Sequence, residues 1–428
     1  MNALARKFDA ESAYSGEIVQ FPAKIPAPTS PGTALVDRKA LARAVDIAAN
    51  VVERRNANPI LANLKLTGNG STLFVTGTDA EIEIAVSVPA AADIHFGVTV
   101  PAHTLRDLAK KAPDCEFVGF TAAEVETKHK TKYEYNPETR KNEEITLDET
   151  YEECVTPAVV DFEKVNYKLN ARPVSEFPAF TMRPSHTFTI DGAVLLDALN
   201  AVSIAISTEE TRYYLNGVYF HVADGKLCMV ATDGHRLCKQ EFEAVDGCEG
   251  MPGVIIPRKT VALLERLWKG KNCPESVKVD VSETRIRFTF GDVAINSSLI
   301  DGTFPDYNRV IPLYNDKMAT FGAAGMIEAI KAVTVISSER GLAVKFEFGN
   351  GNVHLAVNNP DSGSAHTDFA CEYQADALEI GLNARYAIDM LETAGSETVT
   401  FAMAEAGSPI VITGERKGWT GVIMPMRV

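Results

Sequence analysis

The segment 231–237, Ala-Thr-Asp-Gly-His-Arg-Leu, contains an acid and an imidazole two positions apart, Asp233 and His235. Such groups act as metal ligands and as general acids or bases. Either role needs a further His, Asp or Glu at ligand spacing, and none accompanies this pair. The simpler interpretation is a tight turn in which Gly234 supplies backbone freedom and Asp233 caps the turn. The chain also has no glycine-rich phosphate loop, nucleophile elbow or zinc-protease helix motif, so we expect no catalytic residue, no metal and no cofactor.

The composition is that of a globular protein. The chain has 428 residues, of which 46% are hydrophobic and 23% charged, which favours two to four domains. It has no apolar run of the ~18 residues that a membrane helix needs, and its start lacks the apolar core of a secretory signal. Seven scattered cysteines form no Cys-x-x-Cys pair and are interpreted as reduced thiols. We therefore predict a cytoplasmic protein without a membrane partner.

The net charge of -15 argues at first against a nucleic-acid partner, because phosphate binding usually appears as a basic patch. Net charge is a sum over all surfaces, however. A ring that is acidic outside and basic inside has the same sum. The positions of the lysines and arginines therefore decide the question.

An internal repeat indicates the architecture. Three stretches share one order of parts: an amphipathic helix, a hairpin with a glycine turn, a short polar cluster and a second helix. The first helices are predicted at 37–54, 191–207 and 323–338, and the hairpins at 64–77, 218–231 and 344–357. The pattern predicts three tandem α+β domains.

The polar clusters and the second helices keep a consistent spacing. The clusters are Thr78-Asp79, Thr232-Asp233 and Asn358-Asn359, and Pro101, Pro257 and Asn383 follow them by 22, 24 and 24 positions. Proline suits the first turn of a helix, and asparagine suits its N-cap. Each of these three residues is therefore predicted to start the second helix of its domain.

The expected domain boundaries follow from composition and from the repeat. Residues 1–33 are rich in proline and are predicted to be a flexible arm. Domain 1 is expected at 34–183, domain 2 at 184–313 and domain 3 at 314–428. A charged, alternating segment at about 124–163, with the turn Asn136-Pro137-Glu138, predicts a solvated hairpin inserted in domain 1. Contact with an accessory protein and a merely soluble projection both remain open for this insertion.

Ordered motifs then carry a resemblance. They are Asn58-Pro59-Ile60-Leu61, Gly77-Thr78-Asp79, Arg212-Tyr213-Tyr214-Leu215-Asn216-Gly217, the segment 231–237, Pro257-Arg258-Lys259, the segment 302–312 and Met424-Pro425-Met426-Arg427-Val428. With these motifs the chain, from about residue 35 onward, resembles the bacterial DNA polymerase III β subunit, the sliding clamp family.

The resemblance implies a head-to-tail homodimer that closes a six-domain ring, with helices lining the pore and antiparallel sheets outside. Such a ring encircles double-stranded DNA without reading its sequence. It is a non-catalytic processivity factor that tethers the polymerase III α subunit, the clamp loader and other clamp-motif proteins. An alternative from another class is a regulatory or decoy homologue that binds clamp partners without encircling DNA.

Diffuse cationic side chains suffice to hold phosphates. The predicted helices carry Arg38, Lys39, Arg43, Arg54, Arg55, Arg106, Lys110, Lys111, Arg258, Lys259, Arg266, Lys269 and Lys271. The resemblance places DNA contacts at Arg55, Tyr213, Tyr214, Arg258 and Lys259. His103 and Glu209 depart from the arginine and glutamine of relatives.

The resemblance also implies a hydrophobic pocket for short peptide motifs at the edge of domains 2 and 3. Methionine is an adaptable lining for such a receptor. The matching positions are Arg212, Leu215, Thr232, Gly234, His235, Arg236, Leu237, Pro305, Arg309, Val310, Asn383, Tyr386, Ser408, Val422, Met424, Pro425, Met426 and Arg427.

The dimer interface is expected to pair the strand 165–169 of domain 1 with the segment 361–367 of the partner's domain 3. Tyr167 and Leu169 fall on one face of that strand. The segment 361–367 is poorer in acidic residues than in relatives, and Thr104 replaces a basic residue. We therefore expect an interface that depends more on apolar contact and less on salt.

Overall fold

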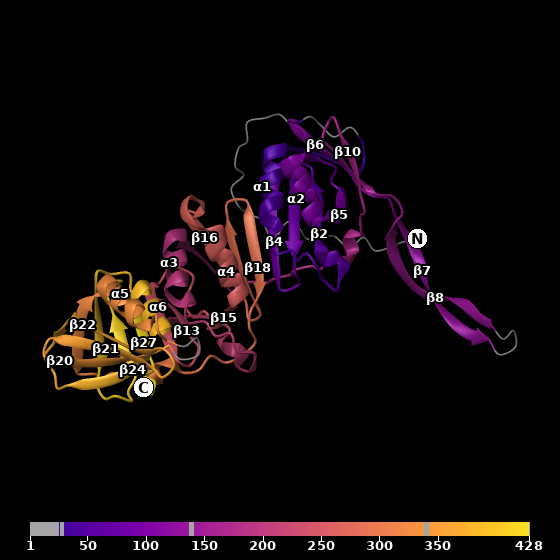
Figure 1. Ribbon diagram of the computed structural model, residues 1–428. Helices are drawn as coiled ribbons and strands as arrows, with labels where there is room; N and C mark the ends of the chain where they lie inside the picture. The colour runs from indigo at the N-terminus through magenta and orange to yellow at the C-terminus, as the bar shows by residue number, and fades with distance from the viewer. Residues whose placement is uncertain (1–24, 26–29, 137–140, 338–341, 428) are drawn as a thin grey trace. The chain divides into compact units, whose positions relative to one another are not determined.

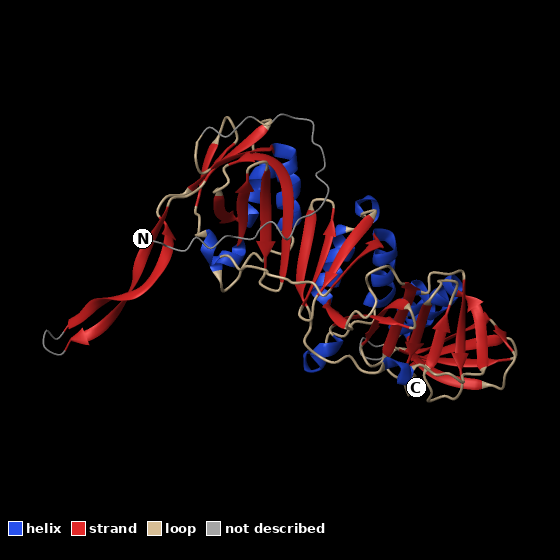
Figure 2. Ribbon diagram, turned by 180° about the vertical axis from the view of Figure 1, so that it is seen from behind, coloured by secondary structure: helices blue, strands red, loops and turns tan. Residues whose placement is uncertain are grey.

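The computed structural model describes residues 25, 30–136, 141–337 and 342–427, and it contains three copies of one module (Figure 1, Figure 2). Each copy has a strand, a helix, four strands, a second helix and three further strands, in that order. The N-terminal copy adds two strands, 125–136 and 141–154, after its second helix, and the C-terminal copy adds the two-residue strand 372–373 before its second helix. The two helices of each copy pack against each other. The predicted α+β fold with three tandem modules is confirmed. The predicted arm at 1–33 lies almost entirely outside the described residues.

The N-terminal domain, together with residues 287–296, forms one compact unit. Its strands are antiparallel in the order β10-β9-β6-β1-β4-β3-β2-β5, because the long strand β4 pairs with β1 at one end and with β3 along the rest. The elements are β1 (Thr33–Asp37), α1 (Arg38–Ala48), η1 (Pro59–Ala62), β2 (Asn63–Asn69), β3 (Thr72–Thr78), β4 (Ile82–Ala92), β5 (Gly97–Pro101), α2 (Ala102–Lys111), β6 (Phe117–Thr121), β7 (Val125–Asn136), β8 (Lys141–Cys154), β9 (Ala158–Asp161), β10 (Asn166–Leu169) and η2 (Val174–Glu176).

The central domain contains the same series of elements. Its strand β14 pairs with β27 of the C-terminal domain, so that the two domains belong to one compact unit. The elements are β11 (His186–Asp191), α3 (Gly192–Ser203), η3 (Glu210–Leu215), β12 (Gly217–Ala223), β13 (Lys226–Thr232), β14 (Arg236–Glu243), β15 (Val254–Pro257), α4 (Arg258–Leu267), η4 (Gly270–Asn272), β16 (Ser276–Val281), β17 (Arg285–Phe290), β18 (Val293–Ser298) and η5 (Tyr307–Val310).

In the C-terminal domain, alternation along the strands separates core from surface. Val344, Phe346 and Phe348 of β20 are buried, and the residues between them are not. The elements are β19 (Lys317–Gly322), α5 (Ala323–Thr334), β20 (Ala343–Gly349), β21 (Asn352–Asn359), β22 (Gly363–Ala370), β23 (Glu372–Tyr373), β24 (Leu378–Asn383), α6 (Ala384–Thr393), β25 (Thr398–Met403), β26 (Ile410–Thr413) and β27 (Trp419–Ile423).

The helix starts agree with the prediction, and the first helices end earlier than predicted. Asn383 caps α6 by accepting hydrogen bonds from two backbone amides, whereas Pro101 and Pro257 occupy the N-cap rather than the first turn. α1 ends at Ala48 instead of residue 54, and the Asn50 side chain donates to the Asp46 and Ile47 carbonyls at the helix end. Val52 is still buried, in irregular backbone, and so imitates the helical spacing beyond the helix end. The predicted end of the third helix, residue 338, lies outside the described residues.

A long two-stranded ribbon leaves the N-terminal domain. β7 and β8 pair only with each other and extend away from the domain (Figure 1). In the chain they are inserted between β6 and β9, which are the first two of the three module strands that follow the second helix. Residues 158–161, predicted inside the insertion, form β9 of the module instead. The Pro137-Glu138 turn lies outside the described residues.

In the described ranges no helix has the length and apolar character to cross a membrane; α3 and α5 have 12 residues each.

Candidate functional site

The turn at 232–236 is built by side chains of its own sequence. The Thr232 hydroxyl donates to the Arg236 carbonyl, 2.7 Å away, and accepts from the Gly234 amide. One carboxylate oxygen of Asp233 accepts from the amides of His235 and Arg236, each at 2.9 Å. Gly234 has a φ of +87°, which favours glycine. The interpretation as a capped tight turn is confirmed.

The C-terminal strand brings a second segment to this turn. In the β14–β27 ladder, Leu237 stands opposite Val422, and just beyond it the Met424 amide donates to the His235 carbonyl at 2.8 Å. The Met426 amide donates to the Gly381 carbonyl, close to the start of α6. The predicted residues 422–427 are thereby held between the central-domain turn and the C-terminal domain.

Arg236 joins the turn to helix α6. Its guanidinium contacts Asp389 at 2.7 Å and Asp233 at 3.1 Å, and its charge lies 4.4 Å from the centre of the Tyr386 ring. His235 stacks on the same Tyr386 ring with centroids 6.2 Å apart. The Arg236 side chain is only 10% exposed, so its ion pairs are shielded from water.

An apolar floor lies beside this turn. Leu215, Leu237 and Val422 are each less than 5% exposed and belong to one buried cluster with Phe304 and Tyr307. Around the floor, large apolar side chains stay in water: Val310 is 47% exposed, Met424 40% and Met426 38%. We call the predicted peptide-contacting residues, with this floor and rim, the docking surface.

The remaining predicted peptide-contacting residues complete the docking surface. Arg212 lies against the turn, since a Cβ on Gly234 would stand 2.7 Å from its guanidinium, and it pairs with Glu209 at 2.7 Å. Ser408 precedes β26, whose Ile410 pairs with Ile423. Pro305 and Arg309 are exposed and flank Tyr307.

An aromatic stack fixes the segment 304–310 behind the docking surface. The Tyr219 ring stacks on Phe304 at 4.9 Å and on His221 at 4.4 Å. His221 Nε2 is hydrogen-bonded to the Tyr307 hydroxyl at 2.9 Å. Burial lowers the pKa of His221 to about 4 and raises the pKa of Tyr307 to about 12, so both groups are neutral near pH 7.

The sequence prediction missed four supporting residues: Phe304, Tyr307, His221 and Asp389. Phe304 and Tyr307 lie within the quoted motif at 302–312, where their spacing of three could have indicated one buried face. His221 and Asp389 have no local signal. Asp389 is 153 positions from Arg236, and only the folded chain brings the two together.

The predicted DNA contacts are at the surface. Arg258 and Lys259 are exposed in the first turn of α4, and Tyr213 is 54% exposed with its ring edge-on to Tyr214. Arg55 is exposed in the turn after α1. Its predicted place on a helix is wrong, as is that of Arg54, because α1 ends at Ala48. Lys269 and Lys271 likewise lie beyond α4, which ends at Leu267.

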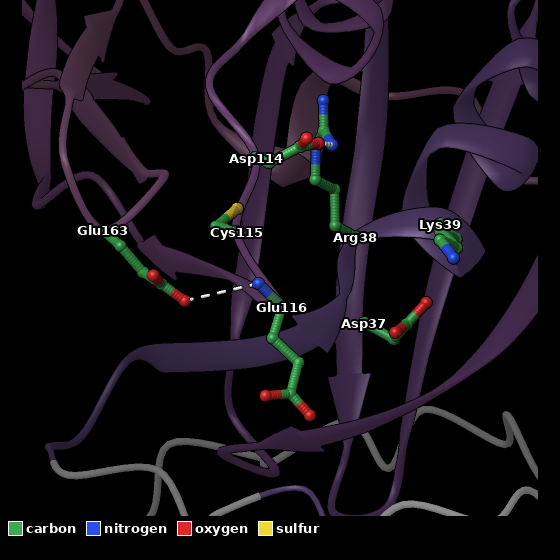
Figure 3. A pocket seen from close by; sticks show the side chains of 7 residues that line it. All are labelled: Asp37, Arg38, Lys39, Asp114, Cys115, Glu116 and Glu163. Atoms are coloured by element: carbon green, nitrogen blue, oxygen red, sulfur yellow. Dashed lines mark hydrogen bonds and ion pairs between the residues drawn. The ribbon is translucent and has the colours of Figure 1, made fainter.

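Some of the predicted helix cations are paired within the chain. Asp46 of α1 accepts from Arg106 at 2.7 Å and from Lys110 at 2.6 Å. Arg38 turns into a hollow of about 670 Å³, where it pairs with Asp114 at 2.5 Å (Figure 3). The hollow is lined by Asp37, Arg38, Lys39, Asp114, Cys115, Glu116 and Glu163. Arg38 and Lys39 are two of the predicted helix cations, and no lining residue is among the predicted peptide-contacting residues, the five DNA contacts or the dimer contacts.

The predicted dimer strand β10 is the last strand of its sheet. Tyr167 is half-buried and packs edge-on against Phe162 at 5.8 Å, and Leu169 is 9% exposed. The two side chains fall on one face, as predicted, and that face is covered largely by the chain itself. β22 is likewise the last strand of the four-stranded sheet β22-β21-β20-β24.

Comparisons with known proteins give one family. The chain matches the DNA polymerase III beta subunit models for the N-terminal domain at residues 33–148, the central domain at 189–306 and the C-terminal domain at 308–427. The beta sliding clamp of Caulobacter vibrioides is 35% identical over 399 residues, covering 92% of this chain and 99% of the relative. The beta sliding clamp of Pseudomonas aeruginosa is 30% identical over 396 residues, again covering 92% and 99%.

Solved structures agree. A Bartonella birtlesii sliding clamp bound to griselimycin has a TM-score of 0.80 and 35% identity, covering 92% of this chain and 99% of that one. A Caulobacter crescentus clamp, with polyethylene glycol bound to its putative beta-motif tethering region, has a TM-score of 0.81 and 34% identity over 92% and 99%. With all three domain models matched in order, the chain belongs to the DNA polymerase III beta subunit family, the beta sliding clamps.

Proposed function

We propose that this sliding clamp receives its partner proteins at the docking surface and holds DNA with Arg55, Tyr213, Tyr214, Arg258 and Lys259. The protein is a non-catalytic DNA sliding clamp, a processivity subunit of DNA polymerase III. As a homodimeric ring it encircles double-stranded DNA and tethers the polymerase α subunit, the clamp loader and other clamp-motif proteins. Its working place is the cytoplasm, in keeping with seven free cysteines.

One observation carries the partner assignment: a buried floor of Leu215, Leu237 and Val422 meets a rim of exposed methionines. A soluble protein seldom leaves several neighbouring large apolar side chains in water except where a partner covers them. Methionine adapts to different peptides, which suits a receptor with several partners. Backbone and polar groups of the turn lie beside the floor and can orient a peptide.

The partner assignment is tested with a labelled peptide of the polymerase α subunit's clamp-binding segment, by fluorescence anisotropy. Met424→Ser combined with Val310→Ser removes rim area and is expected to weaken binding about tenfold or more. Ile94→Ser is the matched control, because Ile94 is 67% exposed in the turn after β4 of the N-terminal domain, which contributes no residue to the docking surface. Equal binding by the double variant and the control would contradict the assignment.

The DNA contacts rest on exposure and on charge placement. Cations in the first turn of a helix oppose the helix dipole and cost a few tenths of a kcal/mol, so Arg258 and Lys259 are not there for the stability of α4. Phosphate contacts make affinity depend on salt. We expect Arg258→Ala with Lys259→Ala to reduce the slope of log affinity against log salt concentration by about two. Lys278→Ala is the control, because Lys278 is 45% exposed on strand β16 and is not one of the predicted helix cations. An unchanged slope in the double variant would remove these contacts from the proposal.

Encircling is tested by topology. A loaded clamp should remain on nicked circular plasmid and slide off once the plasmid is linearised. A decoy homologue that binds partners without encircling DNA predicts equal retention on both forms. Equal retention therefore excludes the ring as the working form.

The ring contact is proposed between β10 of one protomer and β22 of its partner, because each is an end strand whose main chain can accept another strand. Tyr167 and Leu169 support β10 from beneath and add the apolar part. The expected result is a dimer at micromolar concentration that persists in high salt, measured by light scattering. A monomer under those conditions would refute the predicted interface.

A further inference from the structure

The connector between η5 and β19 presents two apolar side chains to water. Tyr314 is 90% exposed and Leu313 is 81% exposed. Isolated exposed apolar residues are common, but two adjacent ones of this size form a patch that water hydrates poorly.

Two polar side chains next to this patch face the protein, Asn315 in the connector and Lys317 at the start of β19, whereas Asp316 between them is 82% exposed. The Asn315 side chain donates to the carbonyls of Ala402 at 2.7 Å and Pro409 at 2.9 Å. The Lys317 ammonium donates to the Ala404 carbonyl at 2.7 Å. Asn315 is thus turned inward while its neighbours Leu313 and Tyr314 are turned outward, which is the reverse of the usual distribution for these residue types. The exposure of Leu313 and Tyr314 needs a reason, because burying a large apolar side chain is worth about 1.5–3 kcal/mol.

Both ends of the connector are anchored at the docking surface. Val310, a rim residue, precedes Leu313 by three positions, and three residues span at most ~11 Å. At the other end, Asn315 is bound to Pro409, the neighbour of Ser408. Leu313 and Tyr314 are therefore held along the border of the docking surface.

We propose that Leu313 and Tyr314 are an apolar extension of the docking surface, which receives an aliphatic or aromatic side chain from the flank of a bound partner peptide. This inference rests on the proposed partner binding. Two side chains offer far less area than the ~1,000 Å² that a stable interface between folded proteins needs, so a second copy of the chain is not the occupant. One flanking peptide residue, continuous with the docked motif, matches the area.

The test uses synthetic peptides in two lengths: the clamp-binding segment of the polymerase α subunit alone, and the same segment extended at each end. In the extended set, each flanking position carries Leu, Trp or Ser in turn. With the wild-type protein, Leu or Trp at one flank should increase affinity about tenfold over Ser at that position. Leu313→Ser with Tyr314→Ser should remove this gain and leave the affinity for the short peptide unchanged.

Ile94→Ser is again the matched control and should keep the full gain. Unchanged thermal unfolding of the double variant shows that its fold is intact. If the short peptide binds but no flank depends on Leu313 and Tyr314, the extension is refuted and the docking surface stands. If the short peptide does not bind the wild-type protein, both proposals fail. Loss of the gain in the Ile94→Ser control would also overturn the extension.

Discussion

The turn after β3 in the N-terminal domain and the turn after β13 in the central domain correspond hydrogen bond by hydrogen bond. Thr78 donates to the Ile82 carbonyl at 2.7 Å, as Thr232 does to Arg236. The Asp79 carboxylate accepts from two amides of its turn, as that of Asp233 does. Ala80 has a φ of +79° where Gly234 has +87°.

The two turns differ in what their fifth residue contacts. Ile82 is 2% exposed and packs inside its own domain. Arg236 reaches Asp389 and Tyr386 of the C-terminal domain. The same backbone therefore serves as a core corner in one domain and as a link between two domains in the other. Threonine and aspartate fix the turn, and the residue that follows them decides its use.

The largest expected effect comes from removing that link. Arg236→Ala leaves Asp389 without its arginine partner in a partly buried position and removes the contact with the Tyr386 ring. We expect a loss of about 2–4 kcal/mol of unfolding free energy, measured by chemical denaturation. Arg309→Ala is the matched control, because Arg309 is 84% exposed and should change stability by less than about 0.5 kcal/mol. Equal losses in the two variants would mean that Arg236 does not stabilise the contact between the central and C-terminal domains.

Acid is expected to lower the stability of the central domain through His221, at a position where the N-terminal domain has Thr67. Thr67 and His221 correspond, since their strands pair with β5 and β15 in the same register. The pKa of His221 is lowered to about 4 by burial, so the unfolded chain binds a proton near pH 6.5 and the folded chain does not. The stability that His221 contributes is complete above pH 6.5 and is lost as the pH falls towards 4, by up to about 3 kcal/mol.

His221→Gln removes the titrating group and can keep a hydrogen bond to Tyr307. The difference in unfolding free energy between wild type and this variant should therefore change between pH 6.5 and pH 4, with the wild type losing more. Denaturation curves at several pH values measure it. A difference that stays constant with pH would contradict the shifted pKa of His221.

The smallest effects come from exchanging the left-handed residues of the two turns. Gly234→Ala strains the backbone and pushes Arg212 aside, for an expected loss of about 1–2 kcal/mol and weaker peptide binding. Ala80→Gly relieves the same strain, and after the entropy cost of glycine it should gain about 0.5 kcal/mol. Thermal unfolding of both variants gives the two signs, and equal signs would show that the turns are not equivalent.

The sequence alone determined the local structure of this protein. The Thr-Asp turns, the Asn383 cap and the three repeated modules depend on residues a few positions apart, and the family motifs are ordered strings. These features can be predicted from the sequence because their hydrogen bonds close within one turn or one hairpin.

Only the tertiary structure decided what each side chain meets. Val52 continued a helical pattern after the helix had ended, because the core accepts a buried valine in any backbone form. Arg38 was expected among the helix cations that can face phosphates, and it pairs with Asp114, 76 positions away. Arg236 contacts Asp389 because β14 pairs with β27. Leu313 and Tyr314 remain exposed to water because Asn315 anchors the connector. Contacts between distant segments depend on packing, which spacing along the chain does not encode.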